Sequence, residues 1–225
     1  SGYGGGFITE NRDFRARYLL FSPNVYQEGH IDRKRPPQSR LTENGTIHLV
    51  ARYEIHLQEG RLVSYRWLKG EEGAGKNIWY AYEVIGDKLP WFNNAAYVDT
   101  MNPDATKKFA EVVYDRYKEY LGEEFSKSVR AIFTDEPQFT KLQAMEDGKV
   151  PQDAGIPYTK GMDEAFRDMY GYGFFEKMPE IFWERADGIL SEMKYHYHNF
   201  IAQRFADSYA GVLGEWCERN HLMLT

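Results

Sequence analysis

The sequence predicts an α/β fold with parallel strands. The prediction rests on two apolar runs, residues 77–85 and 129–134, on an amphipathic helix over residues 103–120 between them, and on the short linker that follows the helix. A strand, a helix and a second strand connected in this way form a crossover unit, and the two strands of such a unit are parallel. We therefore expect both runs to be buried strands of one parallel sheet.

Composition indicates a globular chain. Its 225 residues are 42% hydrophobic and 16% aromatic, which is enough to fill a sizeable core. The net charge of −6 argues against a nucleic-acid partner, and we expect the one basic cluster, Arg33 to Arg35, to lie in a solvated loop before Pro36. No apolar run approaches the ~20 residues that cross a bilayer, so no membrane partner is expected. Cys217 is the single cysteine, and we expect a small buried apolar residue there rather than a disulfide.

A β-hairpin is predicted before the first buried run. Residues 47–55 alternate between apolar and polar, a turn follows at residues 58–61, and residues 62–68 read as the returning strand. Proline and glycine clusters flank this region, so we expect a hairpin insertion over about residues 41–69. The glycine-rich start, residues 2–7, lacks the G-x-G-x-x-G spacing of a dinucleotide loop and is expected to form a tight turn.

The helix over residues 103–120 has clear end signals. Asn102 is placed as N-cap, Pro103 as the first helical residue, and Gly122 follows the last turn. Further along the chain, we expect a loop over residues 141–158, a short helix over 162–170, a long helix over 179–219 and the beginning of a strand over 221–225.

Two adjacent acids follow the second buried run. Asp135 and Glu136 come directly after residues 129–134 and are followed by Pro137. Ligand sites of parallel sheets gather at the carboxyl ends of the strands. Two neighbouring carboxylates repel each other, which favours protonation of one of them and suits a general acid. The other interpretation is that the pair caps the loop or binds a basic side chain, and the residues alone leave both open.

Four segments carry a resemblance to a known family: FTDEP, the helix start YVDTMNP, the opening SGYGGGFI and the stretch RARYLLFSP. In these segments the chain resembles a group of large bacterial glycoside hydrolases related to the α-L-rhamnosidases. The catalytic module of that group is a (β/α)8 barrel. The resemblance implies that Glu136 is the acid or acid/base and Asp135 its companion. Many barrel glycosidases carry Asn-Glu-Pro at this place, and the Asp in the Asn position puts their contact to the sugar 2-hydroxyl in doubt.

By this resemblance the chain is a partial (β/α)8 TIM-barrel fragment with parallel strands and a β-hairpin insertion. Residues 1–225 would then be a piece of a single catalytic domain, with the remainder of the barrel outside it and an extracellular or periplasmic location. Hydrolysis needs a second carboxylate, which the resemblance implies lies after Thr225, so the fragment alone is expected to be inactive.

Four further residues are candidates for substrate binding: Glu83, Trp91, Tyr97 and Asp99. Either acid could bind sugar hydroxyls or calcium, although Asp99 could instead organise the turn before the helix. The high aromatic content, with 17 Tyr and five Trp, suits a sugar-stacking surface. His196 and His198 are two apart on a helix and point in opposite directions, so no shared metal ion is expected.

The sequence thus predicts a glycoside hydrolase acting on polysaccharides or glycans by general acid catalysis. The alternative is a non-catalytic carbohydrate-binding or scaffold protein on the same fold, in which the acids only contact sugar hydroxyls.

Overall fold

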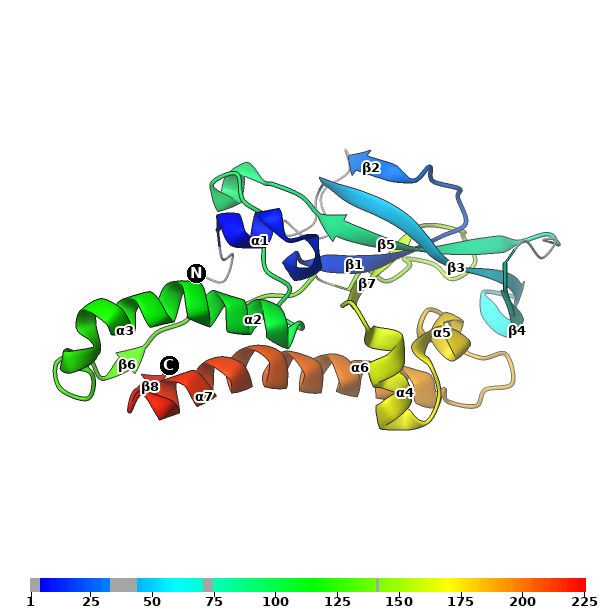
Figure 1. Cartoon of the computed structure of the whole chain (residues 1–225). Coiled ribbons are helices and arrows are strands. Elements are labelled where there is room, and N and C mark those ends of the chain that lie inside the picture. The colour runs from blue at the N-terminus through cyan, green and yellow to red at the C-terminus, as the bar shows by residue number, and fades with distance from the viewer. Residues whose placement is uncertain (1–4, 33–43, 71–74, 141) are drawn as a thin grey trace.

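The chain forms two connected parts, an antiparallel sheet and a layer of long helices with a small parallel sheet. Figure 1 shows this computed structural model, which describes residues 5–32, 44–70, 75–140 and 142–225. Residues 2–4 of the glycine-rich start and the basic cluster Arg33 to Arg35 lie outside the described residues. Gly6–Glu10 form a short helix where the sequence predicted a turn.

The strands are β1 (Arg17–Ser22), β2 (Gly29–Asp32), β3 (Asn44–Gln58), β4 (Arg61–Leu68), β5 (Ile78–Gly86), β6 (Ala131–Ile132), β7 (Ala154–Tyr158) and β8 (Met223–Leu224). The α-helices are α1 (Gly6–Glu10), α2 (Pro103–Phe109), α3 (Asp115–Leu121), α4 (Met162–Tyr170), α5 (Phe174–Lys177), α6 (Glu192–Phe205) and α7 (Val212–Arg219). A π-helical turn, Ala110–Tyr114, joins α2 to α3, and another, Ala206–Gly211, joins α6 to α7.

The larger sheet is antiparallel throughout. Its strand order is β2-β3-β5-β1-β7, with β4 paired to β3, and every pairing between these strands is antiparallel. The predicted partial (β/α)8 TIM-barrel fragment with parallel strands is therefore wrong. The error concerns both predicted strands. β5 pairs with β1 and β3 and does not share a sheet with β6. The run over residues 129–134 is a strand only at Ala131–Ile132, and it is half-buried rather than buried. An apolar run cannot show its partner, so a strand buried between antiparallel neighbours has the same sequence pattern as a parallel one.

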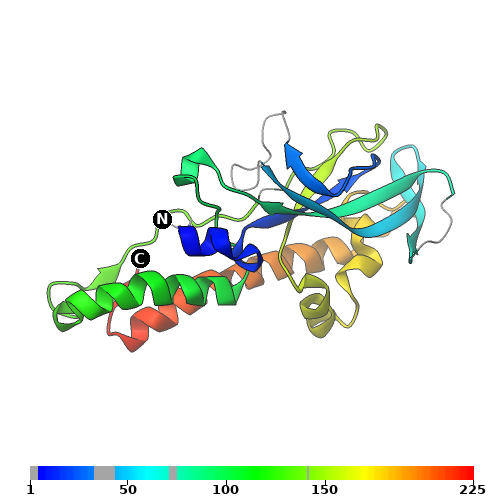
Figure 2. The same cartoon turned by 45° about the horizontal axis from the view of Figure 1, so that its top comes forward.

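The small sheet is the one place among the described residues where strands are parallel. In it Ala131 pairs with Met223 and Ile132 with Leu224. Each strand follows a long helix, and Figures 1 and 2 show that α2–α3 and α6–α7 run side by side beneath and beyond the large sheet. The helix predicted over residues 103–120 is confirmed, as is its cap, because the Asn102 Oδ1 accepts hydrogen bonds from the backbone N–H of Asp104 and of Ala105. The strand predicted over 221–225 is also confirmed, as β8.

The predicted hairpin is present as β3 and β4, which pair from Arg52–Leu68 to Gln58–Arg61. β3 also pairs with β2 and β5, so the hairpin is built into the middle of the sheet. Residues 41–43 lie outside the described part of the chain, and the insertion boundaries stay a prediction.

Two predictions for the second half of the chain need correction. The loop over residues 141–158 contains β7, an edge strand that tolerates Pro157 because only one of its sides pairs with another strand. The long helix begins at Glu192 rather than at residue 179. Gly188 has a φ of +75° and interrupts it, and Ser191 caps the new start by accepting the N–H of Met193.

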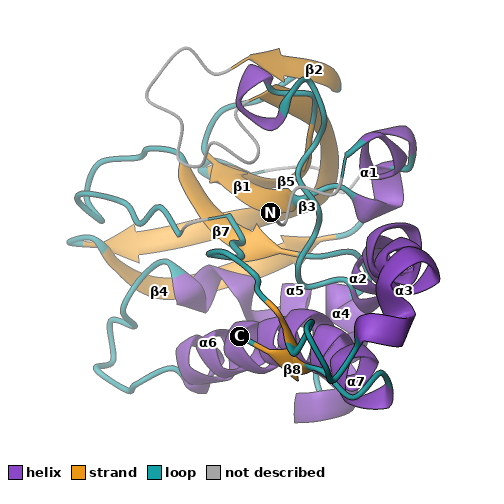
Figure 3. Cartoon of the chain, turned by 90° about the vertical axis from the view of Figure 1, so that its left-hand side faces the viewer, coloured by secondary structure: helices purple, strands orange, loops and turns teal. Residues whose placement is uncertain are grey.

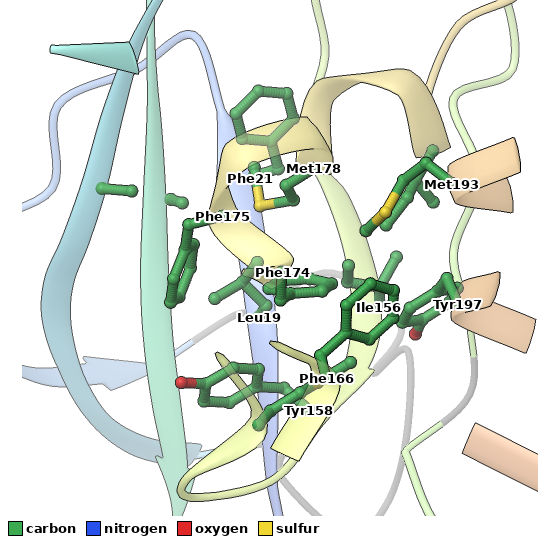
Figure 4. Close-up of a cluster of buried hydrophobic side chains, with 14 of the residues drawn as sticks. Leu19, Phe21, Ile156, Tyr158, Phe166, Phe174, Phe175, Met178, Met193 and Tyr197 are labelled. Atoms are coloured by element: carbon green, nitrogen blue, oxygen red, sulfur yellow. The ribbon is translucent and has the colours of Figure 1, made fainter. Parts of the chain in front are cut away.

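The main core lies between the sheet and helices α4, α5 and α6. Figure 3 shows the helices gathered on one side of the curved sheet. In Figure 4 the side chains of Leu19 and Phe21 on β1 and Ile156 and Tyr158 on β7 meet those of the helical layer: Phe166, Phe174, Phe175, Met178, Met193 and Tyr197. This core fixes the position of the sheet against α6.

Candidate functional site

Asp135 and Glu136 lie just past the carboxyl end of β6. The pairing with β8 continues to Thr134, whose N–H donates to the carbonyl of Thr225 at 2.9 Å, and both acids that follow are exposed. Glu136 has a φ of +41°, in the left-handed region that a non-glycine residue rarely adopts. The residue before a proline is restricted further. This backbone is strained by about 1–3 kcal/mol and persists because its surroundings hold it.

Four hydrogen bonds hold the segment that carries the two acids. On the amino side, Oγ1 of Thr134 lies 2.8 Å from the phenol oxygen of Tyr209. On the carboxyl side, the N–H of Gln138 donates to the phenol oxygen of Tyr97 at 3.1 Å, and its carbonyl accepts from Oγ1 of Thr100 at 2.7 Å. A little further along, the hydroxyl of Thr140 donates to the carbonyl of Arg17 at 3.3 Å.

The two phenols are buried. Tyr97 is 5% exposed and Tyr209 is 3% exposed. Burial raises the pKa of Tyr97 to about 12, against the opposing effect of the hydrogen bond from Gln138. Burial also raises the pKa of Tyr209, with the hydrogen bond to Thr134 acting in the opposite direction. Both hydroxyls therefore stay protonated near neutral pH and keep their hydrogen bonds to the segment.

A buried ion cluster lies on the sheet side of this segment. The guanidinium of Arg17 binds Oε1 of Glu83 at 2.6 Å and lies 3.7 Å from Oδ2 of Asp99. Asp99 also accepts hydrogen bonds from Oγ1 of Thr159 at 2.7 Å and from the N–H of Met101 at 3.1 Å. Strand β1 supplies Arg17 and strand β5 supplies Glu83, so the ion pair joins two neighbouring strands.

Asp99 is 3% exposed, and burial raises its pKa to about 6, although Arg17 and the hydrogen bond from Thr159 act to lower it. Nε of Arg17 is buried and makes no hydrogen bond. With its carboxylate turned to these neighbours, Asp99 organises the cluster and the turn that leads into α2.

The structure brings most of the predicted site residues into one region. Tyr97 contacts the segment that carries Glu136. Asp99 lies two positions after Tyr97 in the chain, and Arg17 links Asp99 to Glu83. Trp91 is 70% exposed and lies in the 3-10 turn Pro90–Phe92. Its neighbour Phe92 packs on Tyr97, with 5.0 Å between ring centroids.

Sequence reasoning missed Arg17, Thr100 and Tyr209. The first two lie on elements whose neighbours could not be predicted. Tyr209 falls within the long helix predicted over residues 179–219, and its ring lies in the core. No signal in the sequence distinguishes a helical tyrosine whose hydroxyl binds a loop from one whose ring only packs in the core.

The described residues hold no group of three or more His, Cys, Asp and Glu side chains that could bind a metal ion. His196 stacks on Tyr170 with 4.1 Å between ring centroids, and its Nδ1 lies 2.8 Å from the hydroxyl of Tyr172, whereas His198 is exposed. Cys217 is buried, as expected.

A cavity of about 820 Å³ lies at the other end of the small sheet. Its lining includes residues 122–126, which precede β6, and residues 219–221, which precede β8. It therefore opens at the amino ends of these strands, whereas Asp135 and Glu136 follow the carboxyl end of β6. Parallel-sheet sites gather at carboxyl ends, so we place the candidate site at the two acids rather than in this cavity. No helix in the described ranges is long and apolar enough to span a bilayer.

No protein-family model matches the chain, and no curated protein matches it. Among solved structures, the chain is similar to the rhamnosidase from Novosphingobium sp. PP1Y, with 17% sequence identity and a TM-score of 0.47 over 67% of this chain. The chain spans 14% of the length of that protein. A likeness of this degree defines neither the site nor the reaction.

Proposed function

We propose that this chain is part of a glycoside hydrolase and that Glu136 is its general acid, with Asp135 as companion. The observation that supports the proposal best is the placement of Glu136. Its side chain is exposed past the carboxyl end of a parallel strand, on a strained backbone held from both sides. Strain of this kind clusters at active sites, where the surrounding structure maintains it. The sequence resemblance of FTDEP supplies the class of reaction.

In this proposal Glu136 donates a proton to the glycosidic oxygen as the bond to the leaving group breaks. The neighbouring Asp135 can accept a hydrogen bond from a sugar hydroxyl. In the proposal Trp91, which is 70% exposed, contacts the sugar. Tyr97 holds the segment through Gln138, and Glu83 and Asp99 bind Arg17 next to it. A second carboxylate, from this chain or from a further part of the protein, would complete the reaction.

The test uses Glu136→Gln and Asp135→Asn in the full-length protein, with a panel of aryl glycosides and matching oligosaccharides. Loss of a general acid is expected to lower kcat by about a hundredfold or more while sugar binding persists. Glu164→Gln, an exposed acid on α4, serves as the matched control and should leave turnover unchanged. An aryl glycoside with a good leaving group should lose less rate in Glu136→Gln than one with a poor leaving group, because it needs less protonation.

The alternative function, a non-catalytic carbohydrate-binding or scaffold protein, gives a different result. Wild-type protein would then bind sugars without cleaving any glycoside of the panel, and both substitutions would alter affinity alone.

A further inference from the structure

Two tyrosines from different parts of the fold contact the segment that carries the acids. Tyr97 lies in the turn region before α2 and packs in the small cluster with Phe92. Tyr209 lies in the π-helical turn between α6 and α7 and stacks on Phe205 with an interplanar angle of 2°. Packing fixes both rings, so each hydroxyl is presented at a defined place.

The two contacts enclose a very short piece of chain. Only Asp135, Glu136 and Pro137 lie between Thr134, which contacts Tyr209, and Gln138, which contacts Tyr97. The ring of Pro137 fixes one of the φ angles in this bridge. With both ends tied, the direction of the Glu136 side chain depends on the two phenols and on the left-handed backbone between them.

We propose that Tyr97 and Tyr209 are positioning residues that together hold Glu136 in its exposed, left-handed conformation. The inference rests on the proposed function for its catalytic consequence, but the holding of the segment is a property of the structure alone. Neither phenol needs to touch the substrate. Their effect on the reaction comes from orientation, where misplacement by about 1 Å can lower a rate by about a hundredfold.

The two tyrosines hold opposite ends of the segment. Tyr209 ties the amino side of the segment to the long helix, whereas Tyr97 and Thr100 tie the carboxyl side to the region next to the large sheet. Removing one hydroxyl should release its own side first. The π-helical turn that presents Tyr209 is a type of irregularity found frequently at functional sites.

The test compares Tyr97→Phe and Tyr209→Phe with Tyr172→Phe in the full-length protein. Each substitution removes one hydroxyl and keeps the ring, and Tyr172 is the matched control because its hydroxyl contacts His196 instead. The first readout is amide hydrogen exchange of Gln138, whose N–H donates to Tyr97. We expect Tyr97→Phe to accelerate that exchange by about tenfold, an effect typical of losing one hydrogen bond, and Tyr172→Phe to leave it unchanged.

The second readout is hydrolysis of the best aryl glycoside. We expect each of the two site variants to lower kcat by about tenfold or more with KM changed less than about twofold, because alignment and not binding is lost. A purely structural role would lower the amount of folded protein, but the folded fraction would keep the kcat and KM of the wild type. Unchanged Gln138 exchange and unchanged kcat in both variants would overturn the inference.

The two proposals fail in different ways. If Gln138 exchange accelerates but Glu136→Gln leaves hydrolysis intact, the phenols hold the segment and Glu136 is not the acid. If Glu136→Gln abolishes hydrolysis while the phenol variants alter neither Gln138 exchange nor kcat, Glu136 is supported as the general acid and the positioning role of the tyrosines is wrong.

Discussion

The phenol oxygen of Tyr209 lies 2.8 Å from Oγ1 of Thr134, and this contact ties the long C-terminal helix to the residue that precedes Asp135. Thr134 is also the last residue of its segment to pair with β8, through its N–H and the carbonyl of Thr225. The position of the acids thus depends on the helix layer as well as on the strand.

A double-mutant cycle measures this contact. Thr134→Val and Tyr209→Phe each remove one hydroxyl, and each is expected to lower the free energy of unfolding by about 0.5–1.5 kcal/mol. Because they break the same hydrogen bond, the double variant should lose clearly less than the sum of the two. Urea unfolding of the four proteins gives the coupling energy. Additive losses would show that the hydroxyls do not interact in solution.

Glu136→Gly should stabilise the protein while removing the proposed acid. Glycine adopts a positive φ without the steric cost of about 1–2 kcal/mol that a side chain incurs, and the greater freedom of the unfolded glycine chain offsets part of the gain. We expect a net increase of about 0.5–1 kcal/mol in the free energy of unfolding. Glu136→Gln keeps the Cβ and should show no such gain. A destabilised glycine variant would mean that the carboxylate itself makes a stabilising contact.

Asp99 should make stability depend on pH between about 4 and 6. Burial raises its pKa from 3.8 to about 6 in the folded protein, so in this window the folded state binds more protons than the unfolded state. The associated stabilisation is present in full below the unfolded pKa and is lost as pH rises through the folded pKa. Its upper limit is on the order of 3 kcal/mol.

Thermal unfolding of wild type and Asp99→Asn across this pH range isolates that contribution, since the other carboxylates are common to both proteins. The stability of wild type relative to the variant should fall as pH rises. A relative stability that rises instead would mean that the ion pair with Arg17 outweighs burial and lowers the pKa of Asp99.

The core between the sheet and the helices is the largest cluster of buried apolar side chains among the described residues. Phe166 is fully buried among aromatic rings, 5.5 Å from Phe200 and 5.9 Å from Phe174 between ring centroids. Phe166→Ala is expected to cost about 3–5 kcal/mol. Phe133 is 73% exposed, and Phe133→Ala should change stability by less than about 0.5 kcal/mol. Equal losses in the two variants would show that Phe133 is covered in solution.

The sequence was most informative where the signal is local. The helix starting at Pro103 was predictable because Asn102, Pro103 and the apolar stripe all lie within it. The hairpin of β3 and β4 was predictable because alternation and a turn lie next to each other in the chain. Strand partners were not predictable, because β1 contacts β7 across more than half of the chain, and no local pattern specifies such a pairing.

The same limit applies to the candidate site. That Asp135 and Glu136 follow a strand could be read from the residues, since the apolar run ends directly before them. The link from Asp99 through Arg17 to Glu83 joins three separate elements, and its existence depends on the antiparallel register of β1 and β5. The role of Tyr209 depends on a helical irregularity that side-chain periodicity does not reveal.

The pairing of β6 with β8 has a consequence for the order of folding. The strand before the acids finds its partner only in residues 223–225, far along the chain. Residues 223–225 are synthesised after every strand of the large sheet. During synthesis the large sheet can assemble, and Gln138 can bind Tyr97 and Thr100, before α6, α7 and β8 have been made. The amino side of the Glu136 segment therefore acquires its contacts to Tyr209 and Thr225 last.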